Sequence, residues 1–399
     1  MPDNDDDLRG LRLAVLAPIA WPVPPPGYGP WEQISYNIAA GMRARGLDVT
    51  LYASGNSRFD GGLQSVVPVS LNEDRALDGN VFDAMHIGKL FEEADRYDLI
   101  HNNFDWKPMT YALARPTPPM LTTIHGFSQP QILAAYYACA HRSFFTSISD
   151  ADRDPGLRYL GTTYNGIDAT SFTFRDRPGD YLLFLGRFHP EKGTHLAIEI
   201  AKRAGIRIKL AGIPHDERYF NELVAPHIDD DAVEYLGEVR GARRDEVLGG
   251  ALALVHMTTR PERFGLTLVE AMACGTPVLG ARMGSIPEIV VDGRTGILCD
   301  DIDAAVAAVP RLASIDRAFC REHVEKHFSI ERMVDRYIEA YRIALRERLP
   351  GAPSATESAA RAHDWWDRPM AFTDIPPRPT SLRFYEGHAP RYSARSHPE

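Results

Sequence analysis

Short apolar runs alternate with stretches of helical periodicity along most of the chain. The apolar runs of the first half are rich in branched residues, as is typical of buried strands, and lie at residues 11–18, 48–54, 97–103, 120–126 and 142–149. Helical spacing separates them, at residues 31–46, 81–94 and 131–140. Strands that alternate with helices predict a parallel sheet covered by helices on both faces.

The alternation breaks at residues 162–180, where glycine, proline and charged residues replace it. We therefore place a domain boundary between residues 170 and 171. The pattern then resumes with strands expected at residues 180–187, 206–212, 232–237, 251–257 and 277–281. Helices are expected at residues 194–205, 216–226, 241–249 and 267–275. The sequence predicts two α/β domains of similar size, at residues 11–170 and 171–328.

The two ends of the chain depart from this pattern. Residues 1–10 form an acidic lead that we expect to be disordered. Residues 329–349 carry apolar positions at helical intervals, which predicts an amphipathic helix that crosses back to the first domain. Residues 350–399 are rich in proline and polar residues, which predicts an extended tail. The pair Trp365-Trp366 in this tail is expected to pack against the body.

Composition and charge narrow the classes of function. The chain has 399 residues, a net charge of -10 and a pI near 5.8, which argues against nucleic acid or anionic lipid as partners. The four cysteines form no Cys-x-x-Cys pair, so neither a zinc site nor a disulfide framework is expected. The acidic start is unlike a signal peptide, and no apolar run approaches about 18 residues. We expect a soluble, cytoplasmic protein that is not integral to a membrane.

Two glutamates flank a glycine in the segment PERFGLTLVEAMACG, residues 261–275. Glu270 stands three residues after Thr267, which is the spacing of a capping box and gives Glu270 a structural interpretation. Glu262 lies before the helix and has no capping role. Unpaired amides at a helix start after Gly265 also suit a phosphate, and the glutamates would then accept hydrogen bonds from hydroxyls on either side of it. Both interpretations of Glu270 stay open at this point.

Two further loops favour a diphosphate ligand. LGRFHPEKG follows an expected strand and presents Arg187 and Lys192 at the carboxyl end of a parallel sheet, where such sheets bind ligands. A solvated basic turn is the alternative for this loop. In the first domain, PPPGYGP places Gly27 and Gly29 after the first strand, at the equivalent edge. A sugar on one side of the diphosphate and a ribose on the other would suit the glutamates.

These motifs together resemble one known family. PERFGLTLVEAMACGTPV is similar to the E-x7-E segment of the retaining glycosyltransferases of family 4, and LGRFHPEKG resembles their Gly-Arg…Lys-Gly loop. YNGID at residues 164–168 and SIPEIVVDGRTGIL at residues 285–298 resemble their domain-junction and C-terminal motifs. The similarity covers about residues 11–347. It implies the GT-B fold, in which two Rossmann-like domains face each other, the first for the acceptor and the second for the nucleotide-sugar donor.

The resemblance implies roles for residues of the second domain. Arg187 and Lys192 would bind the donor diphosphate and stabilise it as the leaving group. Glu262 would contact the hydroxyls of the donor sugar, and Glu270 the ribose. Val239 would border the base. Backbone amides would hold the phosphate and the sugar, and they belong to Phe264, Gly265, Leu266 and Thr267.

In the first domain, the resemblance places His125 below the donor sugar, facing the reacting carbon. Glu262, His125, Arg187 and Lys192 are thus the expected catalytic residues. Gly27 and Gly29 would let their loop approach the phosphate. Family members often continue this loop with a second glycine and a small polar residue, whereas Pro30 and Trp31 follow here. Pro30 has no N–H group to donate, and Trp31 is expected to shape the acceptor side.

The expected function is a metal-independent retaining transfer of a hexose from a nucleoside-diphosphate sugar to a hydroxyl group. UDP-hexose is the favoured donor and GDP-mannose the next, and the acceptor is expected to be a soluble saccharide or small molecule. Neither a metal nor any cofactor beyond the donor is expected. A nucleotide-sugar epimerase on a similar scaffold and a non-catalytic nucleotide-sugar binding protein remain the alternatives.

Other motifs carry weaker signals. Asp152-Arg153-Asp154 and Asp301-Ile302-Asp303 have the Asp-x-Asp spacing of metal-dependent glycosyltransferases, but their contexts favour helix caps and solvated faces. GYGPWE lacks the third glycine that a dinucleotide-binding dehydrogenase requires. Aromatic residues that either line an acceptor site or belong to the core are Trp21, Trp31, Trp106, Phe127, Tyr136 and Tyr137.

Overall fold

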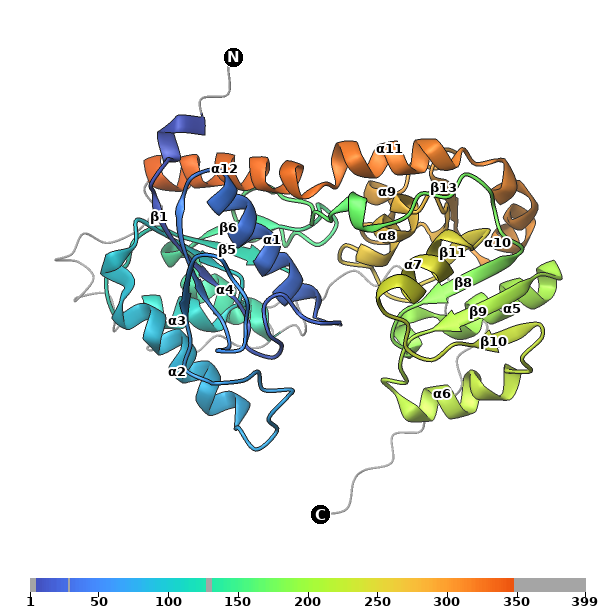
Figure 1. Cartoon of the computed structure of the whole chain (residues 1–399), viewed down its shortest axis with the longest axis horizontal. Coiled ribbons are helices and arrows are strands. Elements are labelled where there is room, and N and C mark those ends of the chain that lie inside the picture. Colours follow the sequence, from blue (N-terminus) through green and yellow to red (C-terminus); the bar gives the residue numbers. More distant parts are fainter. Residues whose placement is uncertain (1–4, 28, 127–130, 348–399) are drawn as a thin grey trace. The chain divides into compact units, whose positions relative to one another are not determined.

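The chain folds into two compact units (Figure 1). The computed structural model describes residues 5–27, 29–126 and 131–347, so the tail expected at residues 350–399 lies outside the described residues. Residues up to Ser171, together with residues 324–347, form the first unit, and residues 172–323 form the second. The chain therefore leaves the first unit within one residue of the expected boundary, and it returns to that unit in the last turn of α11 (Arg317–His327).

The first unit is built around a seven-stranded parallel sheet with the strand order β3-β2-β1-β4-β5-β6-β7. Its strands are β1 (Arg12–Leu16), β2 (Asp48–Tyr52), β3 (Gly62–Gln64), β4 (Leu99–Asn102), β5 (Met120–Ile124), β6 (Phe144–Ser147) and β7 (Tyr159–Thr162). Its helices are α1 (Pro30–Ala44), α2 (Gly79–Glu92), α3 (Lys107–Ala112), α4 (Ile132–Cys139) and α12 (Ile330–Arg346).

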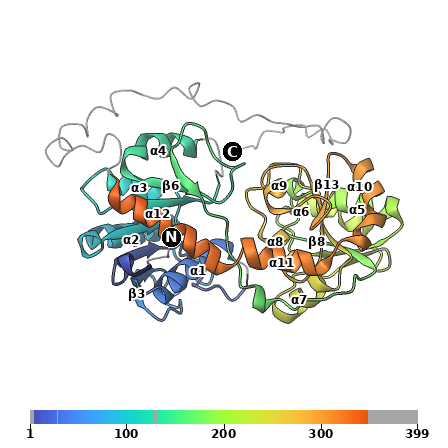
Figure 2. The same ribbon diagram turned by 90° about the horizontal axis from the view of Figure 1, so that it is seen from above.

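Helices cover both faces of this sheet, as the alternating pattern predicts. Ala14 and Leu16 of β1 belong to a core cluster that also contains Leu90 of α2, Met109 of α3 and Tyr136 of α4. Helices α2 and α3 pack side by side, as Figure 2 shows. Helix α1 packs against β1 and β2 and contacts α12. Because β1 is buried on both faces, its sequence RLAVL is almost continuously apolar.

Helix α12 returns the chain to the first unit and packs against α1, β5 and β7. Its Val334 lies against Gly41 of α1 so closely that a Cβ atom at residue 41 would stand 2.3 Å from Val334 Cγ2. The hydroxyl of Tyr341 lies 2.6 Å from Nδ1 of the buried His101 on β4. The amphipathic helix expected at residues 329–349 thus corresponds to α12, Ile330–Arg346, which belongs to the first unit.

The expectation of a disordered lead at residues 1–10 is wrong for its second half. Asp5–Leu8 forms a 3₁₀ helix whose Leu8 is buried. Asp7 pairs with Arg342 of α12 at 3.0 Å, and the Gly10 amide donates to the Gly46 carbonyl at 2.8 Å. An apolar anchor and an ion pair thus tie this polar stretch to the body.

The second unit contains a six-stranded parallel sheet with the order β10-β9-β8-β11-β12-β13. Its strands are β8 (Tyr181–Leu185), β9 (Arg207–Ala211), β10 (Val233–Tyr235), β11 (Ala253–His256), β12 (Val278–Ala281) and β13 (Gly296–Cys299). Its helices are α5 (Thr194–Ala204), α6 (Glu217–Leu223), α7 (Gly241–Gly249), α8 (Leu266–Ala273), α9 (Ile286–Ile289), α10 (Ile302–Ala308) and α11 (Arg317–His327). Helices α5 and α10 lie side by side (Figure 2).

Each sheet has one point at which the strand order reverses direction. In the first unit this point lies between β1 and β4, and in the second between β8 and β11. The loops that leave the carboxyl ends of such neighbouring strands diverge, and open parallel sheets bind ligands in the crevice between them. The topology therefore singles out the described loop residues 17–27 and 103–106 in the first unit, and 186–193 and 257–265 in the second.

Two simpler properties also emerge from the described part of the chain. All four cysteines are free and buried. None of the helices described is both long enough and apolar enough to cross a bilayer.

Candidate functional site

A buried carboxylate joins two loops at the reversal point of the second sheet. Oε2 of Glu262 accepts a hydrogen bond from Nζ of Lys192 at 2.6 Å, and Nε2 of His256 lies 2.8 Å from the same oxygen. Lys192 comes from the loop after β8, and His256 is the last residue of β11. Two of the predicted catalytic residues thus meet, although 70 residues separate them in sequence.

The Glu262 carboxylate is held in its ionised form. Burial alone would raise its pKa, but the hydrogen bond from His256 and the positive charge of Lys192 outweigh this and hold the pKa well below its ordinary value. The Glu262 side chain is 11% exposed, so it keeps access to a ligand while being fixed by its partners. An ionised carboxylate of this kind suits a sugar ligand, because sugar hydroxyls donate hydrogen bonds to carboxylates.

Glycines bring the backbone close to this carboxylate. Gly193 adopts a left-handed conformation, and a Cβ atom there would lie 1.9 Å from the Met257 carbonyl oxygen. At Gly284, also left-handed, a Cβ would stand 2.4 Å from the carbonyl oxygen of Glu262. The loops after β8, β11 and β12 can therefore approach each other only because these positions lack side chains.

The second glutamate of the segment has a different partner from the one that a capping box predicts. Helix α8 begins after Gly265, which is in the left-handed region, and no side chain caps it. Of the two interpretations left open for Glu270, the capping box with Thr267 is therefore wrong. Instead, Glu270 forms an ion pair with Arg244 of α7. The open first turn of α8 leaves amides of Leu266 and Thr267 for a ligand, as a phosphate site requires.

Arg187 and Val239 lie on loops at the same sheet edge, after β8 and β10, and β9 runs between these two strands. Nη1 of Arg187 is 3.4 Å from Nε2 of His215, after β9. Val239 follows β10 and is 8% exposed. In the described part of the chain, Arg187 forms no hydrogen bond or ion pair with Glu262 or Lys192. The predicted residues therefore share one sheet edge, but Arg187 is not joined to the Glu262 cluster.

The predicted residues of the first unit gather at its own reversal point. Pro30 is the first residue of α1, where its missing N–H group costs no hydrogen bond, and Gly29 precedes it. Trp31 stacks on the ring of His125, with 5.3 Å between ring centroids. Nε2 of His125 lies 2.6 Å from Oδ1 of Asn103, which follows β4. Burial lowers the pKa of His125 to about 3, so this ring is neutral in the folded protein.

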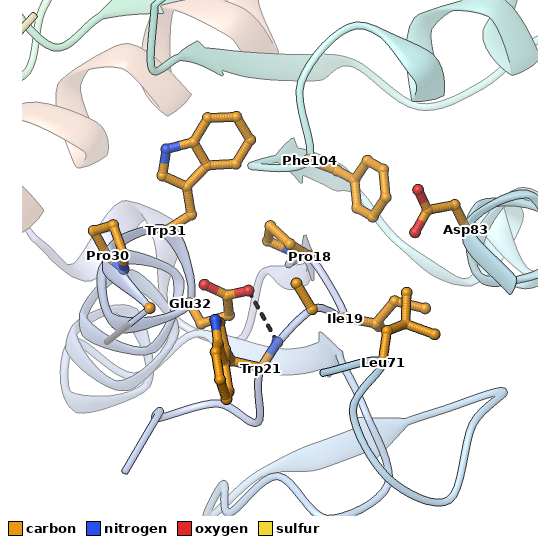
Figure 3. Close-up of a pocket in the computed structure, with 11 residues that line it drawn as sticks. Pro18, Ile19, Trp21, Pro30, Trp31, Glu32, Leu71, Asp83 and Phe104 are labelled. Atoms are coloured by element: carbon orange, nitrogen blue, oxygen red, sulfur yellow. Dashed lines mark hydrogen bonds between the residues drawn. The ribbon is translucent and has the colours of Figure 1, made fainter. Parts of the chain in front are cut away.

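A pocket of about 410 Å³ opens beside these residues. It is formed by the loop after β1, the start of α1, the loop after β4 and α2, and its walls include Trp21, Trp31, Glu32, Asp83 and Phe104 (Figure 3). The volume falls within the range of roughly 300–1,000 Å³ that is usual for small-molecule sites. Gly29 borders this pocket, whereas Gly27, also predicted to bind the donor, is exposed nearby in the same loop.

The aromatic candidates divide between this pocket and the core. Trp21 and Trp31 line the pocket, while Tyr136 is buried in the core and Trp106 and Tyr137 pack against it. Phe127 lies outside the described residues.

The Asp-x-Asp triplets have structural partners. Asp301 caps α10 by accepting from the Ala304 amide at 2.7 Å. Asp154 accepts from the Tyr137 hydroxyl at 2.6 Å. Among the residues that the structure describes, no three or more His, Cys, Asp or Glu side chains are grouped as metal ligands.

Comparison with known proteins agrees with this division into two units. Residues 32–170 match the family model described as Glycosyltransferase Family 4, and residues 172–321 match the one described as Glycosyl transferases group 1. The chain belongs to the family 4 glycosyltransferases. The two matches of this glycosyltransferase coincide with its two parallel sheets, so its fold is GT-B.

Curated relatives of this glycosyltransferase carry several names. A D-inositol 3-phosphate glycosyltransferase of Gordonia bronchialis is 30% identical over 52% of this chain and 48% of its own. One of Mycobacterium avium is 26% identical over 84% of this chain and 95% of its own. The chain therefore spans about half the length of the relative that is 30% identical to it.

Solved structures with the same fold cover nearly the whole of both units. Anabaena Alr3699/HepE in complex with UDP has a TM-score of 0.65 at 20% identity, over 83% of this chain and 100% of its own. Sucrose-phosphate synthase from Thermosynechococcus elongatus has a TM-score of 0.67 at 19% identity, over 83% and 98% of the two chains. At these identities the likeness shows the shared fold of this glycosyltransferase.

Sequence reasoning missed two partners of the predicted glutamates. His256 fixes Glu262, and Arg244 pairs with Glu270. His256 was detectable in principle, because it ends an apolar strand at the ligand-binding edge of the sheet. Arg244 stands among other charged residues of α7, and no pattern in the sequence distinguishes it from them.

Proposed function

We propose that this protein is a metal-independent retaining glycosyltransferase that moves a hexose from a nucleoside-diphosphate sugar to an acceptor hydroxyl. The observation that carries the proposal is the cluster of Lys192, Glu262 and His256 beside the uncapped start of α8. It combines a cation and free amides for phosphate with an ionised acceptor for sugar hydroxyls. UDP-hexose is the favoured donor and GDP-mannose the next.

The donor diphosphate binds between the loop after β8 and the first turn of α8. Arg187 and Lys192 supply positive charge, and amides from Phe264 to Thr267 supply hydrogen bonds. Lys192 is shared between the diphosphate and Glu262, whose Oε2 holds it at 2.6 Å. Glu262 accepts from the donor sugar, Glu270 from the ribose, and Val239 borders the base.

The reaction replaces one bond at the anomeric carbon with another on the same face. The bond between that carbon and the phosphate oxygen breaks, and the electron pair passes to the diphosphate, where the cations and the α8 amides stabilise it. The acceptor oxygen bonds to the carbon, and its proton passes to the departing phosphate oxygen. In the first unit, His125 keeps its expected catalytic role, and its ring is neutral because it is buried.

The acceptor is a saccharide or other small polyol. Four relatives are named as D-inositol 3-phosphate glycosyltransferases, so inositol and its phosphate belong in any acceptor screen.

Turnover of a donor panel tests the proposal. Purified protein is incubated with UDP-glucose, UDP-N-acetylglucosamine or GDP-mannose and mixed acceptors, and free nucleoside diphosphate is measured. Lys192→Ala should lower the rate about a hundredfold or more, as removal of one preorganised charge stabiliser does. Lys202→Ala, on the surface of α5, is the matched control and should retain the rate. Conversion of the donor sugar without release of nucleoside diphosphate would instead indicate an epimerase, and binding without turnover a non-catalytic protein.

A further inference from the structure

The described lining of the pocket in the first unit includes acidic side chains and no basic ones. Two of its described lining residues are acidic, Glu32 and Asp83, and no lysine, arginine or histidine is among them. The acids stand on different elements, since Glu32 is in the first turn of α1 and Asp83 is in α2. Figure 3 shows Glu32 beside Trp21 and Trp31, and Asp83 across the pocket beside Phe104.

Glu32 is a buried carboxyl group without a counter-ion. Its residue is 3% exposed, and Oε1 accepts a hydrogen bond from the Trp21 amide at 3.1 Å. No ion pair to Glu32 occurs within residues 5–27, 29–126 and 131–347. Burial raises its pKa to about 7, which expresses the cost of leaving this charge without a partner. A cation entering the pocket would remove that cost.

Asp83 already has a partner on one side. Its Oδ2 accepts from Nζ of Lys107 at 2.7 Å, and the Lys107 ammonium also lies 5.9 Å from the centre of the Phe104 ring. The lysine satisfies Asp83, so the uncompensated charge of the pocket is concentrated at Glu32. The two tryptophan rings beside Glu32 add faces that attract a cation and pack against a sugar ring.

We infer that the acceptor of this enzyme is a small polyhydroxylated amine, such as an amino sugar, whose ammonium group pairs with Glu32. The ring packs against Trp21 and Trp31, and its hydroxyls reach Asp83. A phosphorylated acceptor meets two carboxylates and no free cation in this pocket, and is repelled. This inference rests on the proposed function, because it names the acceptor class of that reaction.

Equilibrium binding to the full chain tests the inference independently of turnover. Glucosamine, glucose and glucose 6-phosphate are titrated by calorimetry at pH 8, with and without UDP. Glucosamine is expected to bind at least tenfold more tightly than glucose, and glucose 6-phosphate more weakly than glucose. Glu32→Gln should abolish the preference for the amine, and Asp83→Asn should weaken all three sugars. Glu92→Gln, on the exposed side of α2, is the matched control and should change none of these affinities.

The outcomes separate this inference from the proposed function. Equal affinities for glucosamine and glucose, or a preference for the phosphate, would overturn the acceptor class whether or not transfer occurs. If Glu32→Gln does not fold, the affinities of the wild-type chain and of Asp83→Asn for the three sugars still test the acceptor class. If nucleoside diphosphate is released with neutral or phosphorylated acceptors and not with amines, the proposed function stands and this inference is refuted. An amine preference without any donor turnover would support the pocket and contradict the proposed function.

Discussion

The buried Glu32 should make the stability of the first unit depend on pH in a specific way. Burial raises its pKa from 4.5 to about 7. Below about pH 4.5 the group is protonated in both folded and unfolded chains and costs nothing. As pH rises, the unfolded chain loses this proton first, so the folded state is progressively destabilised until about pH 7. The full difference corresponds to about 3 kcal/mol.

Glu32→Gln removes the titrating group and keeps an oxygen for the Trp21 amide. The variant should therefore gain stability over the wild type as pH rises, by about 2–3 kcal/mol between pH 5 and pH 8. Urea unfolding followed by tryptophan fluorescence measures this, because Trp21, Trp31 and Trp106 all lie in the first unit. Glu92→Gln controls for the loss of a surface charge. A gap between Glu32→Gln and wild type that is the same at pH 5 and pH 8 would refute the reasoning.

Further predictions concern packing, the second glutamate and metal. Gly41→Ala should lower the melting temperature, because the added methyl group would meet Val334. Gly88→Ala in α2 is the control: its methyl group would make only an ordinary contact at 3.9 Å, and the variant should be more stable by up to about 1 kcal/mol. Equal shifts of the two melting temperatures in calorimetry would contradict the close packing of α1 on α12. Glu270→Gln should weaken UDP binding measured by titration calorimetry, and a lower melting temperature with unchanged UDP affinity would leave Glu270 only its pairing with Arg244. EDTA should leave nucleoside diphosphate release unchanged, and full loss that a divalent ion restores would disprove a metal-independent reaction.

The central strands were predictable because burial on both faces forces an apolar sequence. β1 (RLAVL) is buried at all but its first residue and appears as an almost continuous apolar run, whereas the fully buried β4 (LIHN) and β5 (MLTTI) combine apolar residues with buried polar ones. β3 and β7 lie at the edges of the first sheet and are only partly buried, so their short polar-containing sequences gave no such signal. No sequence pattern indicated that residues 5–8 are folded either, because one buried leucine, Leu8, and an ion pair between Asp7 and Arg342 hold them to the rest of the first unit.

The candidate site was predictable as a set of residues and not as a set of contacts. The sequence motifs indicated that Lys192 and Glu262 belong to one site, and in the structure Lys192 donates a hydrogen bond to Glu262, a contact that the motifs did not predict. The partners of each glutamate depend on which side chains of other elements reach them, and that is a tertiary property. Thus Glu270, which had the spacing of a capping box, pairs with Arg244, because Gly265 begins the helix without a side-chain cap. The pocket at Glu32 likewise combines loops and helices that no motif connects.

The anomeric configuration of the product tests the central claim most directly. Purified protein is supplied with UDP-glucose or GDP-mannose and an amine-bearing acceptor, and the new linkage is identified by proton NMR as it forms. We predict release of one nucleoside diphosphate per linkage, with the anomeric configuration of the donor kept in the product. A product of inverted anomeric configuration would contradict the account. So would epimerisation of the donor sugar, or a failure to consume either UDP-glucose or GDP-mannose.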